Sequence, residues 1–246
     1  MATTGTLIYE PKGKALEYAQ LACNMYRGCD HACSYCYAPN ATHRFREEFN
    51  RPSTRGDDFL VKLEKEALKR ERAGQVGQVL LCFTCDPYQM FDVSMGLTRQ
   101  VIQILHRHSF DVSVLTKGGS RALRDIDLFT PRDAFASTLT TLDAEESLRW
   151  EPGAALPDDR VATLKAFHEA GIPTWVSLEP VFNPAMVYAI IEETAPFVDL
   201  YKVGKMNYHP VAKEIDWKLF ASTAVEILTR LGKKYYIKQD LLPYLS

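Results

Sequence analysis

Three cysteines near the start of the chain are spaced closely enough to bind one metal cluster. Cys29, Cys33 and Cys36 follow the pattern C-x3-C-x2-C within the stretch "CNMYRGCDHACSYCYAPN", residues 23–40. All six cysteines precede residue 86, a layout that suits a local metal or redox site better than a disulfide framework. The group that binds here must therefore use three thiolates from one loop, without a fourth cysteine at a similar spacing.

A zinc ion and an iron–sulfur cluster make different demands on such a loop. Structural zinc normally takes four protein ligands, often as two C-x2-C pairs, and we expect the other such pair, Cys82 and Cys85, in a strand rather than a turn. Three thiolates on one loop suit three irons of a cubane [4Fe-4S] cluster, with the fourth iron open to another ligand. Zinc and buried, unligated cysteines stay open as alternatives.

The elements that must position these cysteines alternate between strand-like and helical patterns. Strand-like runs are rich in β-branched or aromatic residues: "YAQLACNMY", "GQVLLCF", "FDVSVLT", "DAFASTLTT", "IPTWVSLEP", "FVDLYKVGK" and "KKYYIKQ". Helical patterns lie between them, at residues 58–72, 95–108, 119–129, 158–170, 184–193 and 214–231. Repeated β-α units predict one α/β domain over residues 1–246, with six or seven mostly parallel strands and the cysteine loop after the first.

Composition and charge place few limits on the partner. The 246-residue chain has 46% hydrophobic and 24% charged residues, enough to bury a full core. Its net charge of −2 provides no overall field for nucleic acid, so such binding would need a local basic patch. No apolar run approaches the ~20 residues of a membrane span and the first residues lack a signal-peptide pattern, so we expect a cytoplasmic protein with no membrane partner.

The cysteine motif, with an aromatic residue before its last cysteine and β-α units after it, resembles the radical S-adenosylmethionine (SAM) superfamily. The resemblance covers nearly all of the chain and implies a partial (β/α)6 barrel of the TIM type. It implies two cofactors, a [4Fe-4S] cluster on Cys29, Cys33 and Cys36, and SAM on the open iron. It also implies reductive cleavage of SAM to a 5′-deoxyadenosyl radical, with electrons from a reductant such as flavodoxin or ferredoxin.

Within that superfamily the chain is similar to the spore photoproduct lyase-like (DNA repair photolyase-like) branch. The stretches "SYCYA", "TCDPYQ", "VLTKGGSRALRD", "STLTTLD", "EPGAALPDDR" and "AGIPTWVSLEPV" carry this likeness. It implies that Tyr35 lies near the adenine of SAM and that Tyr37 relays a radical. Packing of the loop is the alternative for both rings.

The likeness also implies a SAM site along the strand ends, where polar residues of (β/α) folds face the catalytic mouth. Lys117 would meet the SAM carboxylate and Ser137 another part of SAM. Glu151 and Arg160 would contact the ribose and carboxylate or form an ion pair that orders their loop. The remaining residues expected in the cofactor site are Asp86, Thr138 and Glu179.

One position departs from the lyase pattern. The lyase has a hydrogen-donating cysteine three residues before the aspartate of the second strand, and Phe83 stands there in this chain, counted back from Asp86. The lyase mechanism therefore does not transfer intact. Cys85 or Cys82 can replace the missing donor, and strand alternation predicts that they lie on opposite faces. A structural role is the alternative for each.

The substrate is predicted from charge and aromatic content. The polar loop at residues 43–55, together with Arg121, Arg124, Lys202 and Lys205, can hold phosphates, and tyrosines can stack on a base. Candidate substrate-binding residues are Tyr88, Lys202, Lys205, Asn207 and Tyr208.

Three functions remain open from the sequence. One is a radical SAM enzyme of the lyase, isomerase or base-modifying class that acts on a nucleobase, most simply a pyrimidine, in DNA, RNA or a nucleotide. The second has the same chemistry on a peptide or small metabolite. The third is a non-catalytic iron–sulfur or zinc protein.

Overall fold

The core of the protein is a parallel β-sheet. The computed structural model describes residues 6–207 and 209–245, and the sheet strands within that part follow one another in chain order. Every neighbouring pair is parallel. The seven strands are β1 (Leu21–Ala22), β4 (Gln78–Leu81), β5 (Asp111–Thr116), β6 (Ala134–Thr138), β7 (Thr174–Leu178), β8 (Leu200–Val203) and β9 (Lys234–Ile237).

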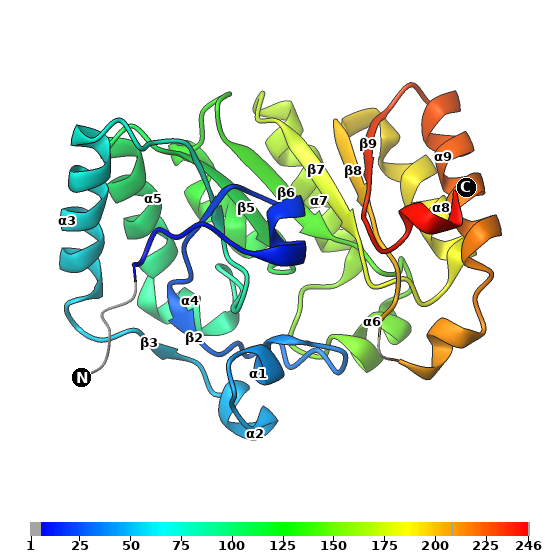
Figure 1. Ribbon diagram of the computed structural model, residues 1–246, viewed down its shortest axis with the longest axis horizontal. Helices are drawn as coiled ribbons and strands as arrows, with labels where there is room; N and C mark the ends of the chain where they lie inside the picture. The colour runs from blue at the N-terminus through cyan, green and yellow to red at the C-terminus, as the bar shows by residue number, and fades with distance from the viewer. Residues whose placement is uncertain (1–5, 208, 246) are drawn as a thin grey trace.

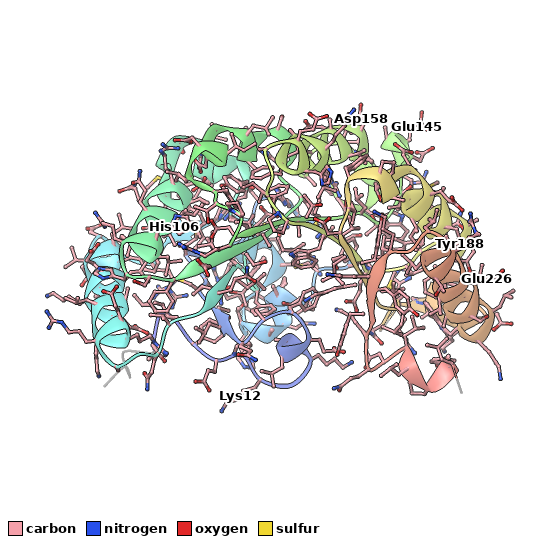
Figure 2. The ribbon with its side chains drawn as sticks, turned by 90° about the horizontal axis from the view of Figure 1, so that it is seen from above. Lys12, His106, Glu145, Asp158, Tyr188 and Glu226 are labelled. Carbon is pink, nitrogen blue, oxygen red and sulfur yellow. The ribbon has the colours of Figure 1, made fainter. Side chains whose placement is uncertain are left out.

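The sheet curls into a half-barrel, as the partial (β/α)6 expectation required. The long helices cover its convex face, and the N-terminal segment lies on the concave side (Figure 1, Figure 2). The parallel order and the curled sheet confirm the predicted fold class. The covering helices are α3 (Phe59–Arg72), α5 (Leu97–Arg107), α7 (Pro157–Glu169), α8 (Pro184–Thr194) and α9 (Trp217–Arg230).

Short elements connect the larger ones, and several surround the carboxyl ends of the strands (Figure 1). They are η1 (Gly13–Glu17), β2 (Tyr26–Arg27), α1 (Ala38–Ala41), α2 (Arg46–Phe49), β3 (Ser53–Thr54), α4 (Met90–Met95), η2 (Gly119–Leu128), α6 (Ala144–Trp150), η3 (Ala195–Phe197), η4 (Pro210–Lys213) and η5 (Leu242–Tyr244). No helix in the described ranges is both long and apolar enough to cross a membrane.

Two predicted helices differ from the observed ones. The pattern at 95–108 forms one helix, α5, which begins two residues later than predicted because Gly96 has φ +58°, outside the helical region, and separates it from the unpredicted helix α4. The segment at 119–129 is the 3-10 helix η2. Its buried residues Gly119, Ala122 and Asp125 recur every three positions, which is the 3-10 rather than the α period.

The predicted first strand is shorter than its pattern. Only Leu21 and Ala22 join the main sheet, while Tyr26 pairs with Thr54 in a separate antiparallel pair of strands, β2 and β3. Asn24 lies between the two segments, where its side-chain oxygen accepts hydrogen bonds from the amides of Phe83 (2.8 Å) and Thr84 (2.9 Å). The chain therefore leaves the sheet immediately after Ala22 and runs to the cysteine loop.

Candidate active site at the carboxyl ends of the strands

The backbone of the cysteine loop is held by an arginine that follows it in the sequence. The amide of Cys36 donates to the carbonyl of Cys33 at 3.1 Å. The two terminal nitrogens of Arg46 donate to the carbonyls of Cys33 (2.9 Å) and Cys36 (3.2 Å). Arg46 thus fixes the part of the loop that carries two of the three thiols.

The start of the loop packs directly on α2. The amide of Cys29 donates to the carbonyl of Phe49 at 2.9 Å. Gly28 has φ +89°, and a side chain there would clash with that same carbonyl. Glycine is therefore required for the loop to approach α2 so closely.

Cys29, Cys33 and Cys36 supply three free thiols on one loop, the donor type that a cubane cluster takes on separate irons. In the part of the chain that the structure describes, no three His, Cys, Asp or Glu side chains converge on one metal position. Cys29, Cys33 and Cys36 are close enough that Cys33 influences the pKa of Cys29 and Cys36 that of Cys33, although burial is the larger cause of both raised values.

Asp86 connects the loop after β4 to the end of β5 and to the cysteine loop. One carboxylate oxygen accepts from the Thr116 hydroxyl (2.5 Å) and the Tyr88 amide (2.8 Å), and the other from the Lys117 amide (2.8 Å). His31 Nδ1 lies 3.4 Å from the second oxygen. Burial by itself raises the pKa of Asp86, but His31 and these donors lower it more, so the pKa lies below its usual value.

A buried ion pair connects α7 to the residue that follows α6. Arg160 Nη1 lies 2.6 Å from Glu151 Oε2, and both side chains are about as buried as any in the protein. Arg160 also donates to the carbonyls of Ala155 (2.7 Å) and Thr138 (3.1 Å). The hydroxyl of Tyr35 donates to the other Glu151 oxygen. Of the two roles weighed for Glu151 and Arg160, this geometry corresponds to the ion pair that orders the loop.

Lys117 follows β5 and lies beside the cysteine loop. Its ammonium is 5.6 Å from the centre of the Tyr35 ring. Burial by itself lowers the pKa of Lys117, but the nearby groups Cys33 and Glu151 raise it above its usual value. The Lys117 ammonium is thus held beside the Tyr35 ring and near Cys33 of the cysteine loop. On the next strand, the Ser137 hydroxyl donates to the Thr116 carbonyl at 3.0 Å, and Thr138 is buried at the end of β6.

Glu179, at the end of β7, takes part in a network on the concave face of the sheet. Its carboxylate pairs with Lys238 at the end of β9 and accepts from the Tyr18 hydroxyl at 3.1 Å. The Lys238 ammonium is 3.9 Å from the centre of the Tyr18 ring. The N-terminal segment therefore closes the concave side directly beside Glu179.

Cys82 and Cys85 do not lie in a strand, and the prediction that they occupy opposite faces was wrong. Strand β4 ends at Leu81, because Asn24 accepts the amide hydrogens that a longer strand would use. Both thiols lie in the loop that follows. Burial raises the pKa of Cys82 above its usual value, and a hydrogen bond with the Cys85 side chain raises it further.

Tyr37 connects the cysteine loop to this second loop. Its hydroxyl donates to the Phe83 carbonyl at 2.8 Å, yet 58% of the residue is exposed. The Tyr35 ring has a different environment, packing edge-on against Phe182 with 5.5 Å between ring centres. Of the two tyrosines beside Cys36, Tyr37 is therefore the more exposed.

The candidate substrate residues are not brought together. Lys202 lies on the concave face, where it donates to the carbonyls of Glu17 (2.9 Å) and Tyr18 (3.0 Å), and burial lowers its pKa to about 8. Tyr88 is buried, with 1% exposed. The other candidates lie near the C-terminus or outside the description: Lys205 contacts Tyr244, Asn207 donates to Asp240, and Tyr208 lies outside the described residues.

The arginines expected to hold phosphates are also engaged within the protein. Arg121 donates to the Gly118 carbonyl at 2.9 Å, and Arg124 pairs with Asp92. Arg124 also pairs with Asp125, so two carboxylates face its charge. These contacts show that both arginines serve to fix η2 and α4.

The sequence model of the radical SAM superfamily matches residues 23–197, which include the cysteine loop and the strands from β4 to β7. The chain belongs to the radical SAM superfamily. Members of this family use a [4Fe-4S] cluster and SAM and need an external reductant. The predicted family and cofactors are thereby confirmed, and a catalytic protein is supported over a zinc or non-catalytic one.

Related sequences extend over most of the chain. The uncharacterized protein MJ0683 of Methanocaldococcus jannaschii is 29% identical over 77% of this chain and 71% of its own length. The uncharacterized protein Rv2578c of Mycobacterium tuberculosis is 30% identical over 70% of this chain, and the match spans 52% of that relative. The chain therefore corresponds to only about half of the mycobacterial protein.

Solved structures share the fold at lower identity. Spore photoproduct lyase complexed with dinucleoside spore photoproduct aligns with a TM-score of 0.72 at 15% identity, covering 96% of this chain and 80% of the lyase. Streptococcus suis SuiB bound to SAM aligns with a TM-score of 0.66 at 12% identity, covering 91% of this chain and 52% of SuiB. At these identities the likeness establishes the partial barrel.

Several residues that organise the site were not among the predicted ones. Asn24, Arg46 and Lys238 all hold parts of it, as described above. Lys238 lies inside the last predicted strand run but directly follows the observed strand β9, so the strand-end rule that selected Lys117 applies to it only once the strand's true end is known. From the sequence, Arg46 could be recognised only as one of several positive charges in a basic loop. Its role could not be predicted, because its two carbonyl partners depend on how that loop folds.

Proposed function

We propose that the protein is a radical SAM enzyme that removes a hydrogen atom from a carbon of a nucleobase, or of a group attached to one, in DNA, RNA or a nucleotide. The observation that carries this proposal is the alignment of 96% of the chain with spore photoproduct lyase in complex with a dinucleoside photoproduct. A pyrimidine is the simplest substrate class consistent with that likeness. The proposal includes a cytoplasmic location and flavodoxin or ferredoxin as the reductant.

Each part of the site has a role in this proposal. Cys29, Cys33 and Cys36 would hold the cluster, and Lys117 would neutralise the SAM carboxylate. When bound, the cluster and SAM supply a carbon-centred radical able to abstract hydrogen. The further groups assigned to the SAM cavity are Tyr35, Ser137, Thr138 and Glu179, while Asp86, Glu151 and Arg160 keep its walls in place.

The residues between the two loops would act on the substrate. Tyr37 has an exposed ring next to the last cysteine of the loop, and a base would stack on it. Cys85 is half-buried next to Cys82 and close enough to Cys29 to influence its pKa. We assign Cys85 as the hydrogen donor to the substrate-derived radical and Cys82 as its neighbour in the relay. Phe83 at the lyase cysteine position favours rearrangement or modification of a base over repair of a thymine dimer.

A second candidate substrate is a peptide. SuiB aligns with 88% of this chain when bound to its precursor peptide, at a TM-score of 0.63. The same loop and strand-end residues would then serve a different substrate class. Nothing in the cofactor assignments would change.

The test is substrate-dependent cleavage of SAM. Anaerobically reconstituted protein with a reductant should release 5′-deoxyadenosine faster when DNA, RNA or nucleotides are added than when peptides are added. Cys36→Ala should abolish the release, and Cys85→Ala should leave it largely intact while product formation stalls. Acceleration by a peptide alone would overturn the nucleobase assignment.

A further inference from the structure

The N-terminal segment joins the two edges of the open sheet. Tyr9 pairs with Ala22 of β1, the first strand in the sheet order, through two backbone hydrogen bonds of 2.9 Å. Residues 13–18, which we call the strap, follow on the concave side (Figure 1). Lys14 of the strap pairs at 2.5 Å with Asp240, which lies just after β9, the last strand in that order. The strap therefore connects the β1 edge of the half-barrel to its β9 edge.

Polar contacts hold the helical part of the strap in place. None of the residues of its 3-10 helix, η1, is buried. Glu17 Oε1 accepts from the Gln239 amide (2.7 Å) and from the Tyr236 hydroxyl (3.3 Å). The Lys202 ammonium donates to the carbonyls of Glu17 (2.9 Å) and Tyr18 (3.0 Å). A segment with few buried apolar contacts opens at a low cost in free energy, so a bound ligand can change its stability.

The hydroxyl of Tyr18, at the end of the strap, lies at the centre of the Glu179 network. It donates to Glu179 Oε2 (3.1 Å), accepts from the Lys238 ammonium (2.5 Å) and lies 3.1 Å from Ser177 Oγ. Burial raises the pKa of Tyr18 well above its usual value and Glu179 raises it further, so the hydroxyl keeps the proton that it donates. Tyr18 and Lys238 therefore fix the same oxygen of Glu179.

The other oxygen of Glu179 is free. Gly204 directly follows β8, between Glu179 after β7 and Lys238 after β9. A Cβ at Gly204 would lie 2.8 Å from Glu179 Cδ and 2.9 Å from Lys238 Cδ, so a glycine leaves the space in which this pair crosses β8. Within the described residues Glu179 Oε1 accepts no hydrogen bond, and 24% of the side chain is exposed. A carboxylate oxygen of this kind can accept from hydroxyl or amino groups, both of which SAM carries.

We propose that Tyr18 is a positioning residue of the SAM site. The strap, through Tyr18, holds the free oxygen of Glu179 toward SAM, and bound SAM stabilises the strap in return. This positioning role rests on the assignment of Glu179 to the SAM cavity in the proposed function and needs no nucleobase. Without the Tyr18 hydroxyl, Glu179 Oε2 keeps only Lys238 as a partner and the carboxylate can turn. By linkage, the factor that the strap adds to SAM affinity equals the factor that SAM adds to strap closure.

Calorimetry of SAM binding to the reconstituted holoenzyme, without reductant or substrate, tests the first direction of this coupling. Tyr18→Phe removes the hydroxyl and keeps the ring, and we expect SAM affinity to fall about 5- to 10-fold, within the usual range of coupling between sites. In a Glu179→Gln background the same change should cost less than about 2-fold, whereas a residue that only supported the fold would cost the same in both backgrounds. Tyr235→Phe changes a tyrosine on β9 that is 38% exposed and does not contact the strap, and this control should bind SAM normally.

Hydrogen exchange followed by mass spectrometry tests the second direction in the unchanged protein. Saturating SAM should slow exchange of the backbone amides of residues 13–18 about 5- to 10-fold through the same coupling. The slowing should be lost in Glu179→Gln saturated with SAM. Peptides from α3, on the convex side of the sheet, are the internal control and should exchange equally with and without SAM (Figure 1).

The possible failures can be told apart. Normal SAM affinity in Glu179→Gln would overturn the assignment of Glu179 and the positioning role together. Weakened binding in Glu179→Gln with normal binding in Tyr18→Phe would overturn the positioning role alone. Equal losses from Tyr18→Phe in both backgrounds, or strap exchange that SAM does not slow, would also overturn it. Failure of the nucleobase assignment would change none of these measurements, because no substrate is present.

Discussion

The guanidinium of Arg160 and the carboxylate of Glu151 lie 2.6 Å apart, with both side chains almost completely buried. This pair joins α7 to the segment after α6, and Arg160 extends the connection to the end of β6 through the Thr138 carbonyl. Tyr35 completes the network from the cysteine loop. The site is therefore built on a charged pair that substrate or cofactor need not touch.

Removing one member of this pair should destabilise the whole protein. Arg160→Leu leaves the Glu151 carboxylate buried without its partner, so we expect a loss of about 3–5 kcal/mol in the free energy of unfolding, measured by denaturant titration of the cluster-free protein. Lys165→Ala on the same helix breaks only an exposed pair with Glu169 and should cost less than about 1 kcal/mol. Equal effects of the two variants would contradict the structural role.

His108 should make stability depend on pH. Its ring nitrogens lie 2.9 Å from a Glu71 oxygen and 2.8 Å from a Glu64 oxygen. These two contacts join the end of α5 to α3. Partial burial by itself lowers the pKa of His108, but the two carboxylates raise it above the usual value. A raised folded-state pKa contributes stability that is fully present below the unfolded-state pKa of about 6.5 and is lost as pH rises through the folded-state value.

The destabilisation caused by His108→Gln should therefore be larger at pH 6 than at pH 9 and should shrink in high salt. Thermal unfolding at the two pH values measures it. His168→Gln, which changes an exposed histidine at the end of α7, provides the control. A His108 effect that does not change between these pH values would refute the ion-pair explanation.

Lys117 should contribute to SAM affinity and not to cluster assembly. A lost charge-assisted contact is worth about 1.5–3 kcal/mol, so Lys117→Gln should weaken SAM binding about 10- to 100-fold in calorimetry while iron content stays at the wild-type level. Lys62→Gln changes an exposed lysine on α3 and should alter neither SAM affinity nor iron content. If Lys117→Gln binds SAM normally, its assignment to the carboxylate is wrong.

Arg46 should be needed for stable cluster binding. Arg46→Gln removes the positive charge that caps the Cys33 and Cys36 carbonyls, and we expect cluster affinity to fall about 10-fold, as for other residues that orient metal ligands. Iron per chain after dilution into a chelator measures the loss. Arg51→Gln, an exposed arginine in the same loop, is the control, and equal retention of iron by both variants would exclude the holding role.

The sheet could be predicted from sequence because its strands are short apolar runs between helical patterns. Ala134, Ala136 and Trp175, which pack on the concave face, all lie within predicted strand runs. The 3-10 character of η2 could not be predicted, since periods of 3.0 and 3.6 residues differ little over one short segment. The turn at Asn24 depends on amides 59 and 60 residues away, which no local pattern reveals.

The candidate site was predictable to a similar degree. The spacing of the cysteines and the position of Lys117 after a strand both have local signals. Lys202 has the same kind of signal, yet its ammonium binds the carbonyls of Glu17 and Tyr18, more than 180 residues earlier in the chain. Strand-end position thus selects candidate residues, but the tertiary partner decides which of them reach the mouth.

The most direct measurement of the central claim is transfer of deuterium from substrate to 5′-deoxyadenosine. The reconstituted enzyme, with reductant and SAM, would be given pyrimidine-containing DNA, RNA or nucleotides deuterated on the base or its substituents, and the 5′-deoxyadenosine would be analysed by mass spectrometry. The account predicts deuterium in 5′-deoxyadenosine from at least one such pyrimidine and none with Cys36→Ala. Unlabelled 5′-deoxyadenosine from every pyrimidine, with label transferred instead from a deuterated peptide, would contradict it.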